Sequence, residues 1–240
     1  MFVPIYDDNP LRTIRAPFIT IFLIVISTAI YLFEMSRQGQ LAAASFAIVP
    51  SELFQMGIFG GPANGIGDAL AVPESFTLVT YMFLHGDPFH LFGNMLFLWV
   101  FGDNVEDALG HLRFLVFYLA CGIFAGLVHA FVVENWITTS SGVPLIGASG
   151  AVAGVITAYL MLHPHVRVWV LAFRFIPLRI SAMFALGAWI LSQFVMLALP
   201  NIGPVAWWAH IGGIVAGGVL VLFMRRPGVA LFGRRPESAV

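Results

Sequence analysis

Charged residues are scarce in this chain, and lysine is absent. Of 240 residues only 10% are charged, 60% are hydrophobic and the mean hydropathy is +0.93. A soluble domain usually carries about a quarter charged residues. This composition excludes a water-soluble surface and predicts that the bilayer is the solvent. A net charge of -1 also excludes a general attraction to nucleic acid, so no nucleic-acid partner is expected.

Cysteine is almost absent as well. The single cysteine, Cys121, lies in an apolar run and excludes an internal disulfide. No HExxH motif is present, which removes the commonest helical zinc-protease signature. No cofactor or metal is predicted.

Long apolar runs are what the sequence does have. A bilayer core about 30 Å thick needs roughly 20 mainly apolar residues per spanning helix. The six candidates are residues 17–33, 89–102, 114–133, 148–163, 180–199 and 206–224. They predict an all-α polytopic membrane protein with one six-helix domain at 17–224, a cytoplasmic tail at 1–16 and another at 225–240. The long connection 34–88 is expected to be partly ordered and to lie in the membrane interface.

The basic residues support this topology. All eleven are arginine, and six spans place ten of them on one side of the membrane, with only Arg37 opposite. Because cytoplasmic loops collect positive charge, both termini are predicted to be cytoplasmic. A cleaved signal peptide is the competing interpretation of the first span, with Ala42–Ala44 as the cleavage site. It is disfavoured because the apolar run is long and polar residues separate it from the alanines.

Four polar side chains fall inside predicted spans at similar depths. His90 begins the second span and Asn94 follows one turn deeper, about 9 Å in, on the same helical face. Ser149 begins the short fourth span, and His210 lies about 9 Å into the sixth. Polar groups at membrane depth are costly and are functional candidates by default. Together they suggest a wet pocket open to the outer face.

Small residues could bring two of these helices together. Gly150 and Gly154 follow Ser149, and Gly213 and Gly217 follow His210. Small residues four apart let helix backbones approach closely in lipid. Each feature also has an ordinary explanation, because a membrane serine often bonds its own backbone and glycines often serve packing alone. Spacing alone leaves packing and catalysis open.

Four motifs, in order, resemble the rhomboid family of intramembrane serine proteases. The segment GASG at 147–150 is similar to the family's nucleophile motif GxSG, and AHIGG at 209–213 is similar to its final-helix histidine motif. HGDPFHLFGN at 85–94 resembles the motif of two histidines and an asparagine, and Gly102, Glu106 and Gly110 resemble the GxxxExxxG pattern. The likeness covers about residues 74–224. GxSG alone would be weak, since soluble hydrolases also use it.

The resemblance implies a role for each matched residue. Ser149 would be the nucleophile and His210 its general base, a dyad without an acidic third member. Gly147 would belong to the nucleophile loop, and the oxyanion would be bound by the Ser149 N–H with the side chains of His90 and Asn94. His85 would support that group, whereas the remaining matched residues would be structural. These structural residues are Glu106, Gly110, Gly150, Gly213 and Gly217.

Two departures from the family pattern concern the surroundings of the site. Phe76-Thr77 stands where many relatives carry Trp-Arg in the first long loop, and Ala153 replaces an aromatic residue that stacks on the catalytic histidine. Trp207 or Trp208 is the expected substitute for that stacking residue. The gating element is expected in the fifth span or near Gly203-Pro204.

The predicted function is that of an intramembrane endopeptidase. Its expected partners are transmembrane protein substrates in a lipid bilayer, and its expected location is a bacterial inner membrane; the sequence makes no prediction of oligomeric state. One alternative is a non-catalytic rhomboid-like protein that binds membrane helices. A second is a metal-dependent membrane enzyme or transporter that uses His85, His90 and His210, although the first two are five positions apart, which suits one helical face poorly.

Overall fold

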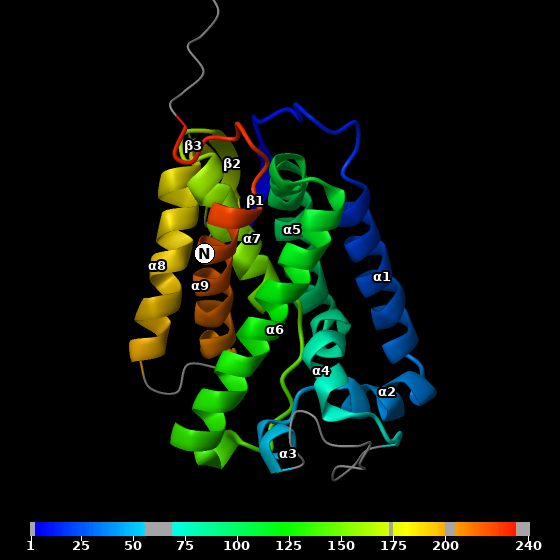
Figure 1. Cartoon of the computed structure of the whole chain (residues 1–240). Helices are drawn as coiled ribbons and strands as arrows, with labels where there is room; N and C mark the ends of the chain where they lie inside the picture. Colours follow the sequence, from blue (N-terminus) through cyan, green and yellow to red (C-terminus); the bar gives the residue numbers. More distant parts are fainter. Residues whose placement is uncertain (1–2, 56–68, 173–174, 200–204, 234–240) are drawn as a thin grey trace, which may run out of the picture.

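The computed structural model describes residues 3–55, 69–172, 175–199 and 205–233 as a helical bundle with a small sheet at one end (Figure 1). The long helices are α1 Phe18–Glu34, α5 Pro88–Leu109, α6 His111–Trp136, α7 Ser149–Leu162, α8 Ala182–Ala198 and α9 Trp207–Met224. The shorter ones are α2 Arg37–Ala43, α3 Pro50–Gln55 and α4 Glu74–Thr80, with 3-10 turns at Ala44–Phe46, Tyr81–Phe83 and Thr138–Ser140.

Each predicted span corresponds to a long helix, but the number of spans stays a prediction. Among the described residues, α6 and α9 are long and apolar enough to cross a membrane, and α1 joined to the segment after its 110° bend would be a third. The helices α7 and α8 are apolar but shorter. Helix α5 continues to Leu109, well past the predicted end at Gly102, and its last turns carry acidic residues. By length and composition, two or three of the six long helices in the described residues could therefore cross a membrane.

The all-α prediction is wrong at one end of the bundle. Strands β1 (Val3–Asp7), β2 (Arg167–Ala172) and β3 (Ile176–Ser181) form an antiparallel sheet in the order β1-β2-β3. The first strand lies in the predicted 1–16 tail, and the other two occupy the predicted loop between the fourth and fifth spans. Val168 and Val170 alternate with exposed residues and are buried, which is the period-two pattern of a half-buried strand.

The described residues of the connection 34–88 lie at the opposite end of the bundle from the sheet, where α2, α3 and α4 gather (Figure 1). These residues are largely helical, so the expectation of partial order is met there. Residues 56–68 lie outside the described residues, as do Gly203-Pro204. The described arginines follow the predicted division. The sheet end of the bundle carries the described arginines of the first tail, of the sheet, of the start of α6 and of the end of α9. Arg37 starts α2 at the opposite end.

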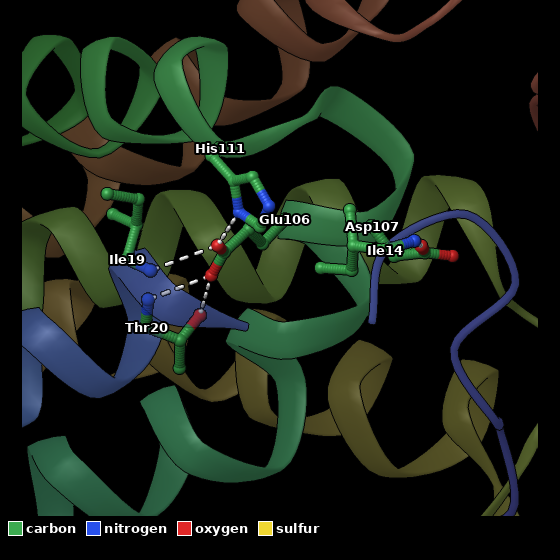
Figure 2. Close-up of polar contacts among 6 residues, drawn as sticks. All are labelled: Ile14, Ile19, Thr20, Glu106, Asp107 and His111. Atoms are coloured by element: carbon green, nitrogen blue, oxygen red, sulfur yellow. Dashed lines mark hydrogen bonds and ion pairs between the residues drawn. The ribbon is translucent and has the colours of Figure 1, made fainter. Parts of the chain in front are cut away.

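Acidic residues at the end of α5 hold the start of α1. The Glu106 carboxylate accepts hydrogen bonds from the backbone N–H groups of Ile19 (3.0 Å) and Thr20 (2.8 Å), from the Thr20 hydroxyl and from His111 (Figure 2). No side chain of the preceding residues caps α1, so Glu106 satisfies its otherwise unpaired N–H groups and complements the helix dipole. The next residue, Asp107, accepts three backbone N–H groups of residues 12–14.

Gly110 makes the turn between α5 and α6. Its φ of +90° is a conformation that favours glycine, and a Cβ there would meet the Arg226 guanidinium. The backbone N–H of Arg226 in turn donates to the Ala108 carbonyl. The tight turn thus leaves space for the segment after α9 to pack against the end of α5.

Candidate active site

Ser149 and His210 are in direct contact. The Ser149 hydroxyl lies 2.9 Å from Nε2 of His210. Ser149 is the first residue of α7, and His210 lies in the first turn of α9, so both side chains are presented at the same end of two adjacent helices. His210 is buried and Ser149 is half-buried.

Glycines allow this contact by bringing α7 and α9 together. A Cβ on Gly213 would collide with the Gly150 carbonyl oxygen, and a Cβ on Gly217 would collide with the Gly154 carbonyl oxygen. The two backbones therefore touch directly at two levels, one turn apart. This is the close approach that small residues four apart permit in membrane helices. The predicted glycine faces do meet each other.

The loop before Ser149 is held by backbone bonds to the connection 34–88. Leu145 pairs with Ile48 through two backbone hydrogen bonds, and the Gly147 N–H donates to the Tyr81 carbonyl at 2.9 Å. The Tyr81 hydroxyl is itself fixed by donating to the carbonyl of Gly122 on α6. These bonds determine where the chain enters α7, and hence where Ser149 is placed.

Both the backbone conformation and the space at residue 147 require glycine. Its φ is +117°, and a Cβ would lie 2.6 to 2.7 Å from ring atoms of His90. The imidazole of His90 therefore lies directly against the nucleophile loop, two residues before Ser149. The N-terminus of α5 is fixed by Asp87, whose carboxylate accepts the backbone N–H groups of Phe89 and His90.

His85 packs against the His90 ring. The two imidazoles meet edge to face with centroids 5.2 Å apart. Burial lowers the pKa of His85 to about 4, with a further lowering from the neighbouring His90, so this ring is neutral at pH 7. Its Nδ1 lies 3.2 Å from the Phe83 carbonyl and its backbone N–H donates to Glu34.

Asn94 lies one turn below His90 and is buried. Its side-chain amide donates to the His90 carbonyl at 3.1 Å, so the amide is directed up the helix toward the site. The first intrahelical bond of α7 runs from the Val152 N–H to the Ala148 carbonyl, which leaves the N–H groups of the preceding residues unpaired within the helix. The start of α7 therefore offers free backbone donors, the His90 ring lies against Gly147, and the Asn94 amide lies one turn below that ring.

Two residues that the sequence interpretation missed hold His210 from the other side. Nδ1 of His210 lies 2.7 Å from Oε1 of Gln193, and the His210 ring stacks at a tilt on Trp189 with centroids 6.0 Å apart. Both residues belong to α8, one turn apart. A usable signal was present, because Gln193 is the one amide side chain in the predicted span 180–199, and polar groups at membrane depth are functional candidates by default.

The two departures from the family pattern have structural counterparts. Trp207, one of the two expected substitutes for the stacking residue, meets His210 edge-on at 5.7 Å, and Trp189 meets it at a tilt with centroids 6.0 Å apart. Thus two tryptophans contact the ring although Ala153 cannot. In α4, Phe76 is exposed and the Thr77 hydroxyl donates to the carbonyl of Glu74, within the same helix.

The geometry gives the metal hypothesis no three-ligand group. Among residues 3–55, 69–172, 175–199 and 205–233, no set of three His, Cys, Asp or Glu side chains is placed to hold a metal ion. Instead, His210 is engaged on both nitrogens and His85 contacts His90 ring to ring.

Comparison with known proteins places this chain among rhomboid proteins. The family model for the rhomboid domain matches residues 73–227. Rhomboid protease GluP of Bacillus subtilis (strain 168) is 33% identical over 182 residues, covering 76% of this chain and 32% of that protein. The human presenilin-associated rhomboid-like protein, mitochondrial, is 31% identical over 142 residues, covering 56% of this chain and 34% of that protein.

The chain belongs to the rhomboid family, and the family prediction is confirmed. With its apolar helices, it is an integral membrane protein. RHOMBOID-like protein 12, mitochondrial, of Arabidopsis thaliana is a further relative, 26% identical over 155 residues, which cover 60% of this chain and 44% of that protein. The chain thus spans a third to less than half of the length of these relatives. Because some relatives are mitochondrial, membership does not select a bacterial inner membrane.

Proposed function

We propose that this protein is an intramembrane serine endopeptidase that uses Ser149 and His210 as a catalytic dyad. The observation that carries the proposal is the 2.9 Å hydrogen bond between the Ser149 hydroxyl and Nε2 of His210. A nucleophile within hydrogen-bond reach of a base that is itself oriented by a third group is the usual arrangement of covalent hydrolases. The named GluP relative is a rhomboid protease, which favours the same chemistry.

The reaction would proceed in two steps. In the first, the Ser149 oxygen bonds to the substrate carbonyl carbon while its proton passes to Nε2 of His210. His210 then returns that proton to the leaving amine as the C–N bond breaks, which leaves an acyl ester on Ser149. In the second step, water attacks the ester, its proton passes through His210 to the serine oxygen, and the carboxylic product is released.

The negative oxygen of each tetrahedral intermediate needs hydrogen-bond donors. The unpaired N–H groups at the start of α7 are fixed by the backbone and favour negative charge through the helix dipole. His90 lies against Gly147 and Asn94 is directed toward it, so both side chains are candidates for further donors. Glu106, Gly110, Gly150, Gly213 and Gly217 support the helices that carry these groups.

The substrates would be membrane proteins that present a peptide bond at the outer end of the bundle. An intact helix satisfies its carbonyl groups internally, so a cleavable segment must locally unwind before Ser149 can attack. Helix-weakening Gly or Pro near the cleaved bond is therefore expected in substrates. We further propose that all six long helices span the membrane, as one domain over residues 17–224, with both termini and residues 1–16 and 225–240 cytoplasmic. A bacterial inner membrane remains the proposed location.

The test is labelling of the purified protein with a fluorophosphonate probe, which reports an activated serine without requiring the substrate. Wild-type labelling that disappears in Ser149→Ala and His210→Ala supports the proposal, with Ser51→Ala on α3 as the matched control that keeps its label. Absence of wild-type labelling, with folded protein and a probe active on a control hydrolase, would overturn it. That result, together with binding of intact membrane helices, would favour a non-catalytic rhomboid-like protein.

A further inference from the structure

The side chain of Gln193 is fixed by contacts on both of its polar atoms. Its Nε2 donates to the carbonyl of Trp189 at 2.8 Å and to the hydroxyl of Ser192 at 2.9 Å, and its Oε1 faces Nδ1 of His210 at 2.7 Å. The side chain is 3% exposed. Because both polar atoms of this buried amide have hydrogen-bond partners, the Gln193 side chain is held in one orientation.

These contacts determine which end of the amide faces the histidine. The Trp189 carbonyl can only accept a hydrogen bond, so the group beside it must be the amide NH₂. The atom that faces His210 is then the amide oxygen, which can only accept. Nδ1 of His210 must therefore carry a proton, and in a neutral imidazole Nε2 is left with a free lone pair.

That tautomer is the one that a general base requires. Nε2 is the nitrogen that faces Ser149, and only its unprotonated form can accept the hydroxyl proton. The reversed amide would place NH₂ against Nδ1, move the imidazole proton to Nε2 and prevent proton transfer from the serine. An aspartate fulfils this orienting function in the serine-histidine-aspartate triad, where the wrong tautomer abolishes most of the activity.

We infer that Gln193 is a positioning residue that holds His210 in the tautomer and orientation needed to deprotonate Ser149, so that a neutral amide acts as third member of the site. This inference rests on the proposed function. Trp189, one turn earlier on α8, places its ring against the imidazole with centroids 6.0 Å apart and planes inclined by 35°, and the same ring packs on Phe97 of α5 at 6.0 Å. Helix α8 therefore takes part in the site through two side chains.

The experiment compares Gln193→Met, which keeps the length and removes the acceptor, with Gln193→Glu, which keeps an acceptor oxygen. Second-order rate constants for fluorophosphonate labelling are measured, with Gln38→Met on exposed α2 as the matched control. The expected loss for Gln193→Met is about tenfold, corresponding to one neutral hydrogen bond that aligns the base. Gln193→Glu should keep most of the wild-type rate.

Two labelling results would overturn the inference. A wild-type rate in Gln193→Met would show that packing alone is needed, and equal losses in Gln193→Met and Gln193→Glu would show that the acceptor is irrelevant. The ¹⁵N chemical shifts of His210 test the tautomer independently of activity: a protonated Nδ1 is expected in the wild type, and a protonated Nε2 there would also overturn the inference. If wild-type protein fails to label at all, the proposed function fails instead, and the two failures are distinguishable.

Discussion

Replacing Gly213 by alanine should separate the two halves of the catalytic pair. The added Cβ would lie 1.9 Å from the carbonyl oxygen of Gly150, whereas real Cβ atoms essentially never approach another heavy atom closer than 3.0 Å. The helices must therefore move apart by roughly 1.1 Å at this level. Carried to the first turn of each helix, the same shift would lengthen the 2.9 Å bond between Ser149 and His210 to about 4.0 Å, beyond hydrogen-bond range.

The expected result is a loss of activity larger than the loss of stability. Overpacking should lower the free energy of unfolding by about 1–3 kcal/mol. The labelling rate of folded protein should fall by about 10- to 100-fold, because misplacement of a reacting group by about 1 Å can cost that much. The assay combines fluorophosphonate labelling kinetics with thermal unfolding in the same detergent.

Gly187→Ala is the matched control, since Gly187 lies inside α8 and a Cβ there meets nothing within 4 Å. Alanine in that helix should be neutral or stabilising by up to about 1 kcal/mol, with labelling unchanged. Equal labelling rates for Gly213→Ala and wild type would refute the reasoning, because the helices would then tolerate a Cβ at their closest contact without moving the dyad.

Three further predictions concern groups away from the serine. Glu106→Ala leaves the N–H groups at the start of α1 unpaired and should lower the free energy of unfolding by about 2–4 kcal/mol, while the labelling rate of folded protein, measured beside thermal unfolding, stays unchanged. Burial raises the pKa of Asp7 to about 7, so the contribution of Asp7 to stability is present below its unfolded pKa near 4 and is lost as pH rises to 7. The difference in melting temperature between wild type and Asp7→Asn should therefore change in that window, and a constant difference would contradict the assignment. Tyr81→Phe removes one buried hydrogen bond to the Gly122 carbonyl and should cost about 0.5–1.5 kcal/mol by the same unfolding assay, whereas an unchanged melting temperature would show the bond to be dispensable.

Much of the fold was predictable because the bilayer imposes simple rules on composition. All six apolar runs are helices, and the glycines at 150, 154, 213 and 217 meet across the predicted contact. The sheet was not predicted, because the arginines of β2 and β3 led to a loop interpretation that overlooked the alternation of Val168 and Val170. The end of α5 was misplaced at Gly102 because the helix continues past its apolar run, where the buried Glu106 is satisfied by donors from α1.

The amino-acid sequence alone determined the family, the helical bundle and the residues that carry the motifs, because apolar length, glycine spacing and short motifs are local properties. Only the tertiary structure decided which groups surround His210. Gln193 lies 17 residues away on another helix, and nothing in its neighbourhood along the chain specifies that its amide oxygen faces the imidazole. That relation depends on how α8 packs beside α9, and packing of distant elements is set by the whole set of contacts rather than by any one segment.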